Sequence, residues 1–406
     1  MAQLLLENAR VILEGGVQRG GVLVREGRIA QVFTHDKTPS GLSAQESIDL
    51  QGAYLAPGLI DIHIHGSVGV DVQATDAGGL DKLSKYLLAE GVTGYFATLV
   101  PTDERGYREA LAAINSYVER QDKAYRSSNP QHGARILGIH FEGPFVSETR
   151  CGALRRQHFR TYDGDARSIE LFTGGPRDGR PSGVPRLMTL APETRGGLDL
   201  TRELSRASVR AFIGHSQADL ETLDLAADAG SRHITHFPNA LDPLHHRTPG
   251  VVAWGLLRED VTLDCIADFH HVHPLVLRLM YQSKGADRMA LISDAIMPAG
   301  LGDGEFSVWG EKVTVRDGRT GLARQPGEST IAGSVITMRE ALKNIIDVGA
   351  PIQEAVRMAS LVPARVAGID SVHGSIEEGK RADLIAFGDD FAVRLATIEG
   401  VLALCK

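Results

Sequence analysis

Hydrophobic and polar positions are arranged differently at the ends of the chain and in its middle. Residues 3–50 contain short apolar runs separated by glycine-containing turns, and the segment 374–404 has the same character. Short apolar runs with such turns predict β-hairpins. We therefore expect both ends to build one small β-sheet domain, formed by residues 1–52 and 371–406.

The middle of the chain repeats a strand-like run followed by a helix-like stretch. Apolar runs over 55–64 and 94–99 precede polar or glycine-containing turns, and helical spacing follows, as over 80–90 and 107–120. This alternation predicts a parallel sheet with crossover helices, and the length suits an α/β fold of the (β/α)8 TIM-like barrel type over residues 53–370. A doubly wound open sheet is the structural alternative, but no G-x-G-x-x-G fingerprint supports it.

The strongest chemical signal is the segment 57–66, PGLIDIHIHG, which carries His63 and His65 two positions apart. Alternate residues of a strand point to the same face, so both imidazoles can reach one ion. An isolated H-x-H motif is equally consistent with two exposed histidines. Here an apolar run precedes the pair and a glycine follows it. The histidines are therefore expected at the carboxyl end of a strand, where barrel enzymes carry their sites.

Four further strand ends carry groups that bind metals or transfer protons. Apolar runs end at or just before Glu142, His215, His236 and Asp294. Each has an ordinary structural explanation by itself, since a buried histidine can hydrogen-bond a loop and an aspartate can cap a helix. Five strands ending in such residues together predict a divalent-metal site. A non-catalytic scaffold or binding protein on the same fold is the rival interpretation, and the presence of every candidate ligand argues against it.

These residues stand in a context that resembles the N-acetylglucosamine-6-phosphate deacetylases, which are amidohydrolases. The block 235–250, THFPNALDPLHHRTPG, is the most specific part, and similar blocks at 56–71, 140–145 and 293–300 occur in the family's order. The resemblance covers nearly the whole chain. It implies a distorted (β/α)8 barrel with a small β-sandwich domain made by both termini, and a homodimer.

The resemblance also implies which residues bind metal. It assigns one ion to Glu142, His215 and His236 and a second ion to His63 and His65. One or two divalent ions are therefore expected, with zinc favoured and iron, manganese or cobalt as alternatives, because histidine and carboxylate ligands suit all of them.

The same resemblance identifies Asp294 as the catalytic acid/base. It also implies that Arg247 reaches the sugar phosphate in the neighbouring subunit's site. The positions that match substrate contacts are Ala153, Asn239, Ala240, Arg247, His271, Ile331, Ala332 and Gly333.

Two positions depart from the family pattern. Leu154 stands where members commonly have a histidine that polarises the amide carbonyl, and the nearby His158 matches a different family histidine. Phe269 stands where glycine is usual, and a phenyl ring there is expected to narrow the pocket. Both departures leave the exact substrate open.

Composition limits the partners. Fifty-one acidic and 43 basic residues give a net charge of −8, which argues against a general affinity for nucleic acid or anionic membranes. An anionic substrate would therefore need local positive charge, which Arg247 would supply. The three cysteines form no C-x-x-C motif, and neither a signal-like start nor an apolar stretch of the roughly 20 residues that span a bilayer is present. We expect a cytoplasmic protein.

The expected reaction is metal-dependent hydrolysis of the N-acetyl group of N-acetylglucosamine 6-phosphate to glucosamine 6-phosphate and acetate. The fold and the metal site do not fix the substrate. The alternative is therefore deacetylation of a related compound on the same scaffold: a galactosamine phosphate, an unphosphorylated amino sugar or an N-acyl amino acid.

Overall fold

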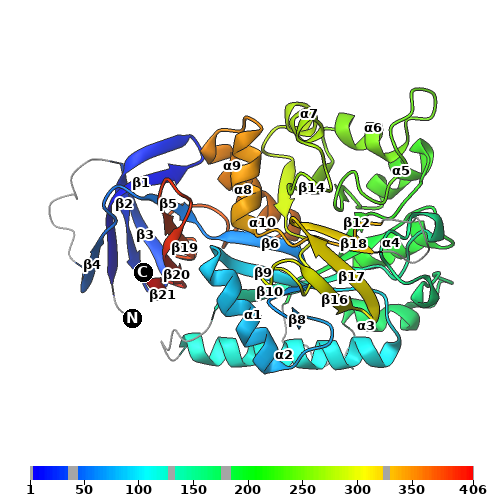
Figure 1. Cartoon of the computed structure of the whole chain (residues 1–406), viewed down its shortest axis with the longest axis horizontal. Coiled ribbons are helices and arrows are strands. Elements are labelled where there is room, and N and C mark those ends of the chain that lie inside the picture. Colours follow the sequence, from blue (N-terminus) through cyan, green and yellow to red (C-terminus); the bar gives the residue numbers. More distant parts are fainter. Residues whose placement is uncertain (1–2, 35–43, 127–132, 175–183, 323–329, 406) are drawn as a thin grey trace.

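The computed structural model contains two β-structures that lie side by side (Figure 1). A barrel of parallel strands and surrounding helices makes up most of the molecule. A sheet built from both ends of the chain packs against one side of this barrel. The structure describes residues 3–34, 44–126, 133–174, 184–322 and 330–405.

Eight parallel strands form the barrel that the sequence predicts, in the order β6-β9-β10-β11-β12-β13-β14-β15. The barrel closes where β6 meets β15, through a bridge between Ile64 and Ala295 and a 2.8 Å hydrogen bond from the His65 amide to the Ala295 carbonyl. Most strand residues are buried on both faces, as expected when helices cover a parallel sheet. The strands are β6 (Leu59–Ile64), β9 (Val92–Leu99), β10 (Arg135–Glu142), β11 (Arg186–Leu190), β12 (Arg210–Ile213), β13 (His233–Ile234), β14 (Thr262–Ile266) and β15 (Met289–Ile292).

Helices follow the strands and cover the outside of the barrel. Helix α1 begins after Asp76, whose carboxylate accepts hydrogen bonds from two amides of the first turn, and α8 begins with a capping box between Thr337 and Glu340. These caps satisfy amides that have no partner inside the helix. Across the described ranges, no helix combines the length and apolarity that crossing a membrane requires. The helices are α1 (Ala77–Ala89), α2 (Glu104–Arg126), α3 (Glu170–Thr173), α4 (Gly197–Arg206), α5 (Leu220–Asp228), α6 (Gly250–Leu257), α7 (Pro274–Lys284), α8 (Met338–Asp347), α9 (Ile352–Ala359) and α10 (Leu361–Ala367), with 3-10 turns η1 (Glu148–Arg150), η2 (Arg156–His158) and η3 (Ala166–Ile169).

The two ends of the chain form one sheet, in the order β21-β20-β19-β5-β1-β2-β3 with β4 also paired to β1. The sheet curls so that Arg28 of β3 bridges to Arg381, which precedes β19. The curled sheet encloses its own apolar cluster, which includes Leu6, Val22 and Leu384. The exact domain boundaries stay a prediction. The strands are β1 (Leu4–Leu13), β2 (Gly16–Arg25), β3 (Arg28–Phe33), β4 (Glu46–Asp49), β5 (Tyr54–Pro57), β19 (Leu384–Phe387), β20 (Val393–Ile398) and β21 (Val401–Cys405).

The apolar run over 55–64 belongs to both structures, although the sequence pattern predicts a single strand. Its first part, β5, pairs with β1 and β19 in the terminal sheet, and its second part, β6, pairs with β9 in the barrel. Gly58 separates the two parts, and a Cβ there would lie 2.0 Å from the Thr93 hydroxyl oxygen. The chain therefore passes from the terminal sheet to the barrel at Gly58, where the close approach of Thr93 leaves room only for glycine.

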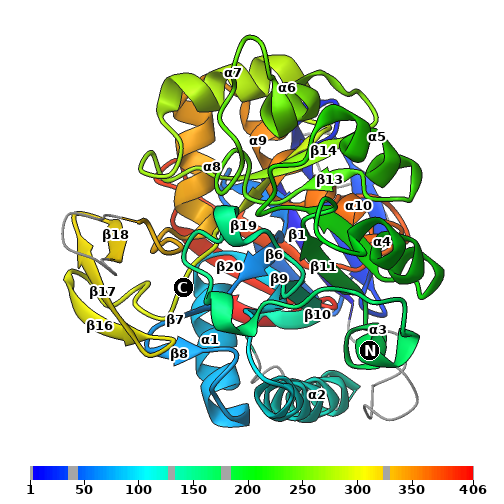
Figure 2. The ribbon, with the colours of Figure 1, turned by 90° about the vertical axis from the view of Figure 1, so that its right-hand side faces the viewer.

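Two small antiparallel sheets lie at the carboxyl ends of the barrel strands, and the sequence pattern does not predict them. β7 (Gly66–Ser67) pairs with β8 (Val70–Asp71). β16 (Gly304–Val308), β17 (Glu311–Arg316) and β18 (Arg319–Leu322) form the other sheet. Figure 2 shows that β16-β17-β18 lies to one side of the barrel opening. This insertion delays the helix that would follow β15 until Met338.

Candidate active site

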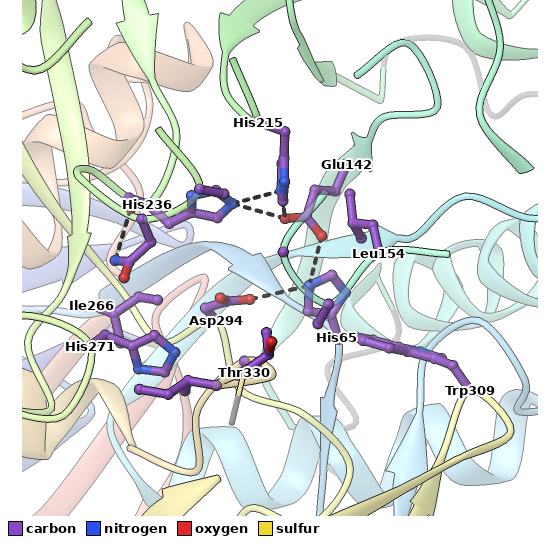
Figure 3. Close-up of a pocket in the computed structure, with 16 residues that line it drawn as sticks. His65, Glu142, Leu154, His215, His236, Ile266, His271, Asp294, Trp309 and Thr330 are labelled. Carbon is purple, nitrogen blue, oxygen red and sulfur yellow. Dashed lines mark hydrogen bonds and ion pairs between the residues drawn. The ribbon is translucent and has the colours of Figure 1, made fainter. Parts of the chain in front are cut away.

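The side chains predicted to bind metal or transfer protons converge at the carboxyl ends of the barrel strands (Figure 3). They come from β6, from the end of β10 and from residues that follow β12, β13 and β15. All are buried, with at most 7% of any residue exposed. They are His63, His65, Glu142, His215, His236 and Asp294.

His63 and His65 form the first pair, on one face of β6. Their Nε2 atoms lie 3.2 Å apart, and His65 Nε2 lies 3.3 Å from Glu142 Oε2 and 3.2 Å from Asp294 Oδ1. His65 Nδ1 lies 3.3 Å from the Thr98 carbonyl oxygen. Donation of Nδ1–H to that carbonyl leaves Nε2 free to bind a metal. The Nε2 atoms of His63 and His65 therefore face the same point, as the two-residue spacing predicts.

His215 and His236 form the second pair, and each follows a different strand. Their Nε2 atoms lie 3.0 Å apart and 2.9 and 3.0 Å from Glu142 Oε1, respectively. His215 Nδ1 lies 2.8 Å from the Arg150 carbonyl oxygen, which again leaves Nε2 free. Both histidines have a left-handed backbone, with φ of 48° and 35°. This conformation costs a non-glycine residue on the order of 1 kcal/mol and clusters at functional sites.

Glu142 lies between the two pairs, with one carboxylate oxygen toward each. Burial alone would raise the pKa of Glu142, but the charge on His63 and hydrogen bonds from His215 and His236 hold it well below its ordinary value. Burial likewise opposes charge on His65, but hydrogen bonds to Asp294 and Glu142 outweigh it and raise the pKa of His65 to about 10. The carboxylates therefore make the centre of this cluster strongly favourable for positive charge.

The geometry of the cluster fits a divalent cation. Two atoms each about 2.1 Å from one ion at a tetrahedral angle lie about 3.4 Å apart. Within each pair the ring nitrogens are 3.0 to 3.2 Å apart, and each pair together with Glu142 places its ligand atoms within 4.8 Å of one another. Asp294 Oδ1 is buried and lies 3.2 Å from His65 Nε2 and 3.3 Å from His63 Nε2, so it also faces the centre of the cluster. The cluster can hold a divalent metal, with Glu142 shared between two groups of ligands.

Asp264 of β14 supports the second pair from inside the barrel, and the sequence analysis did not identify it. Its carboxylate accepts a hydrogen bond from the His236 amide and lies 2.9 Å from His233 Nε2. His233 Nδ1 in turn lies 2.8 Å from the Thr262 hydroxyl oxygen. This network, in which Asp264 and His233 are buried, holds the backbone of His236 in its left-handed conformation. The available signal was an aspartate within an otherwise apolar strand.

Asp61 supports the first pair in a similar way, and it too was missed. Its buried carboxylate accepts hydrogen bonds from the amides of His63 and Ser293 and from the Ser293 hydroxyl. Burial raises the pKa of Asp61 to about 6, although these hydrogen bonds oppose the rise. The Asp294 amide donates to the His63 carbonyl at 2.9 Å. These bonds cross the seam between β6 and β15 and hold Asp294 against the first pair.

His140 belongs to the same sequence motif as Glu142, but its contacts are those of a structural residue and not of a metal ligand. Its Nδ1 lies 3.1 Å from the Ile62 carbonyl oxygen, and its Nε2 lies 2.8 Å from the Thr189 hydroxyl oxygen. Burial lowers the pKa of His140 well below its ordinary value, and the ring is neutral. Its nitrogens are both engaged, so it does not join the candidate ligands.

A pocket of about 260 Å³ opens onto the candidate ligands. Its lining includes the predicted contacts Ala153, Asn239, Ala240, His271, Ile331 and Gly333. His271 Nδ1 lies 2.6 Å from the Asp268 carboxylate. The side-chain Nδ2 of Asn239 donates a hydrogen bond to the His236 carbonyl at 3.0 Å.

Two of the predicted substrate contacts lie outside this lining. Ala332 is buried in a small apolar cluster next to the pocket. Arg247 is exposed on the loop before α6, with Nη1 2.8 Å from His246 Nε2. Among the described residues that line the pocket, none is lysine or arginine. The described part of the pocket lining therefore supplies no permanent positive charge for a phosphate.

The structure corrects the expectation for Phe269. Phe269 is absent from the pocket lining and packs against the barrel core instead, so its ring does not narrow the pocket. Its φ of 65° explains why glycine suits this position. Leu154 does line the pocket, whereas His158 does not, so His158 cannot replace a histidine at position 154.

The lining also contains residues that the sequence analysis did not identify. Trp309 comes from the turn between β16 and β17, and Ile266 and Thr330 come from the end of β14 and from the segment after β18. Trp309 has an ordinary hairpin setting in the sequence, so no motif points to it. Only the position of the inserted sheet brings it to the pocket.

Comparisons with known proteins agree with this geometry. The model of the amidohydrolase family matches residues 279–403, from α7 to β21. The N-acetylglucosamine-6-phosphate deacetylase of Bacillus subtilis (strain 168) is 35% identical over 403 residues, which cover 98% of this chain and 97% of that protein. The N-acetylgalactosamine-6-phosphate deacetylase of Escherichia coli O157:H7 is also 35% identical, over 350 residues that cover 86% of this chain and 87% of that protein.

A solved structure shares the whole fold. A substituted N-acetyl-D-glucosamine-6-phosphate deacetylase from Mycobacterium smegmatis, in complex with N-acetyl-D-glucosamine-6-phosphate, superposes with a TM-score of 0.84. The two chains are 28% identical, and the match covers all of both. The similarity therefore includes the barrel, the terminal sheet and the strand ends that carry the candidate ligands.

Proposed function

This chain belongs to the N-acetylglucosamine-6-phosphate deacetylase family of amidohydrolases, and from this premise we propose how it hydrolyses N-acetylglucosamine 6-phosphate to glucosamine 6-phosphate and acetate. The observation that carries the proposal is the buried cluster of four histidines and Glu142 with Asp294 at its edge, open to one pocket. That arrangement combines a cation site with a carboxylate that can move a proton, which are the two requirements for amide hydrolysis at neutral pH.

We propose that the cluster holds two divalent ions, most simply zinc, with iron, manganese or cobalt as alternatives. Glu142 with His215 and His236 supplies three protein ligands and leaves an open position, the pattern of catalytic sites. His63 and His65 with Glu142 form the second group. A bound ion would supply Lewis acidity, which makes water acidic enough to attack near pH 7 and polarises a carbonyl oxygen.

Asp294 moves the proton in the proposed mechanism. Burial would raise the pKa of Asp294, but the charge on His63 and a hydrogen bond from His65 keep it below its ordinary value, so the carboxylate is ionised. It can therefore accept a proton from the attacking water as the C–O bond forms. Asp294 then donates that proton to the amide nitrogen as the C–N bond breaks, because an amine leaves poorly unless it is protonated.

The pocket residues orient the substrate around this proton transfer. We propose that Asn239, Ala240 and His271 contact the sugar and that Ile331 and Gly333 line its edge, with Ala153 across the pocket. Ala332 supports the edge from behind rather than lining it. Holding the acetamido group against Asp294 in one orientation converts the attack into a unimolecular step.

We further propose that the active unit is a homodimer in which Arg247 reaches the phosphate in the neighbouring site. The lining residues that the structure describes include no arginine or lysine, while Arg247 lies on an exposed loop. Large apolar side chains near this loop and on α6 and α7 are exposed: Leu244 by 59%, Leu257 by 80% and Leu275 by 69%. Exposed apolar groups of this size commonly mark a protein interface.

Subunit mixing tests this arrangement directly. Arg247→Ala lacks the phosphate contact that it gives to its neighbour, and Asp294→Asn lacks its own acid/base, so each homodimer should be nearly inactive. In a mixed dimer, one site combines an intact Asp294 with an intact Arg247 from the other subunit. Recovered activity after co-refolding supports the proposal. No recovery, or Arg247→Ala that hydrolyses the phosphorylated sugar normally, contradicts it.

A second candidate substrate is N-acetylgalactosamine 6-phosphate, because a deacetylase for that compound is as similar in sequence as the glucosamine enzyme. The two sugars differ only in the orientation of one hydroxyl group. Amine release should be measured from both phosphates and from N-acetylglucosamine, with protein reconstituted with zinc, manganese or cobalt. A higher kcat/KM for the glucosamine phosphate, abolished by chelator, supports the main proposal. A preference for the epimer supports the second candidate.

A further inference from the structure

Trp309 occupies an unfavourable backbone conformation at the edge of the pocket. It forms, with Gly310, the two-residue turn between β16 and β17, and both residues have positive φ, of 52° and 80°. Such hairpin turns favour asparagine, aspartate or glycine at the first position. A bulky aromatic residue in this conformation is an outlier, and strain of this kind is retained where surrounding contacts require the side chain.

The contacts of Trp309 fix its indole ring toward the metal ligands. The Trp309 ring packs edge-on against the ring of His65, with centroids 5.1 Å apart. The Trp309 carbonyl also accepts a hydrogen bond from Arg155, the residue after Leu154. The turn is therefore tied to the loop that carries Leu154.

Leu154 and Trp309 form a continuous apolar wall. Leu154 is 3% exposed and belongs to a cluster with Val100 and Val146, against which Trp309 packs. Trp309 also packs against the apolar core of the inserted sheet. At Leu154 this wall offers no polar group to a substrate atom that faces it, because the leucine side chain has neither donor nor acceptor.

The mechanism places the acyl group at this wall. Figure 3 shows Leu154 and Trp309 on the right of Asp294, and His271 on its left. The amide nitrogen must face Asp294, and the sugar extends from that nitrogen toward Asn239 and His271. A secondary amide is planar and trans, so its two substituents point in opposite directions. The acyl substituent therefore extends toward Leu154 and Trp309.

We infer that Leu154 and Trp309 are specificity-determining residues that select a short, unsubstituted acyl group. The inference rests on the proposed deacetylation at the same site. The Leu154 side of the wall accepts a methyl group and gives no partner to a hydroxyl, so an N-glycolyl amide binds its transition state less well than an N-acetyl amide. Trp309 limits the length of the acyl chain, because its ring occupies the space into which a longer chain would extend.

The test compares four substrates that differ only in the acyl group: the N-acetyl, N-propionyl, N-butyryl and N-glycolyl derivatives of glucosamine 6-phosphate. One methylene group in an apolar pocket changes kcat/KM by about tenfold. Trp309→Ala should therefore raise the butyryl-to-acetyl ratio of kcat/KM at least about tenfold. Leu154→Asn, which keeps the branching of the side chain but replaces its two methyl groups with polar atoms, should raise the glycolyl-to-acetyl ratio by about the same factor.

Phe306→Ala is the matched control, because Phe306 lies on the same inserted sheet and packs in its core but does not line the pocket. This variant should leave both ratios unchanged. Inhibition by glucosamine 6-phosphate, which has no acyl group, should be the same in all variants. Ratios that stay within twofold in Trp309→Ala and Leu154→Asn, or that shift equally in Phe306→Ala, overturn the inference. If the unsubstituted protein binds metal but hydrolyses none of the four compounds, the proposed function itself fails and the inference falls with it.

Discussion

The two histidine pairs of the candidate site reach the same carboxylate by different structural routes. His63 lies on β6 and His65 follows the last residue of that strand, with the His65 amide hydrogen-bonded to the Ala295 carbonyl across the barrel seam. His215 and His236 follow different strands, and each has a left-handed backbone conformation. The first pair therefore follows from the geometry of a single strand, whereas the second pair depends on the register of several strands and on polar supports such as Asp264.

The pairs also differ in what surrounds them. Asp294 lies beside the first pair, within 3.3 Å of His63 Nε2 and 3.2 Å of His65 Nε2. The second pair faces the open part of the pocket through His236, near Asn239 and Ala240. From this difference we propose that the two pairs have separate tasks. The first pair stabilises the charge of Asp294 beside its own ion, and the second pair with Glu142 presents a three-ligand site to the substrate.

The largest expected effect comes from removing the carboxylate that both pairs share. Glu142→Gln keeps the size of the side chain but removes its charge, so both groups lose their common anionic ligand. We expect less than about a tenth of the native metal content and a fall in kcat/KM of at least about 10³-fold. Metal analysis by mass spectrometry beside steady-state kinetics checks this. Native metal content in Glu142→Gln would show that the pairs bind independently of it.

Asp294→Asn should lose turnover while keeping metal. Positioned acid–base catalysis contributes about 10² to 10⁴-fold, and asparagine can neither accept the proton from water nor return it to the amine. We expect kcat to fall about 10³-fold, with near-native metal content and little change in inhibition by glucosamine 6-phosphate. A near-normal rate at full metal content would remove Asp294 from the proposed mechanism.

Substituting one histidine of each pair should distinguish them. His236→Asn removes a ligand of the three-ligand site, so we expect about half of the metal to be lost and kcat to fall about 10²-fold. His63→Asn should also lose about half of the metal, but with a decrease in kcat of only about tenfold, since the three-ligand site is intact. The two variants are compared at equal protein concentration. Equal losses of activity would mean that the pairs do not have separate tasks.

Asp264→Asn should produce the smallest of these effects, because Asp264 acts through His236 rather than on the substrate. The asparagine side chain can still accept one hydrogen bond. It cannot accept hydrogen bonds from both His233 and the His236 backbone amide, as the carboxylate of Asp264 does. Loss of such supports typically lowers metal affinity about 10 to 100-fold. Titration with a competing chelator measures the affinity directly. Saturating metal should restore most of the activity, and a variant that stays inactive at saturating metal would contradict a purely positioning role.

The sequence by itself determined the elements of this protein and the chemistry of its strand ends. The alternation of apolar runs and helical stretches predicts the barrel, because parallel strands covered by helices must be apolar on both faces. The spacing of His63 and His65 is also a local property, since period-two geometry places both rings on one side. The predicted barrel, the terminal sheet and the residue types at five strand ends are all present in the structure.

Only the tertiary structure decided how those groups are held and what else reaches them. Asp61 and Asp264 read as isolated polar residues in apolar strands, and their partners lie 232 and 28 residues away in the chain. Trp309 lies on an inserted sheet that carries no motif, and Phe269, which has a positive φ, packs against the barrel core and does not line the pocket. The physical reason is that strand periodicity acts over a few residues, whereas closure of the barrel and placement of an insertion depend on contacts between distant segments.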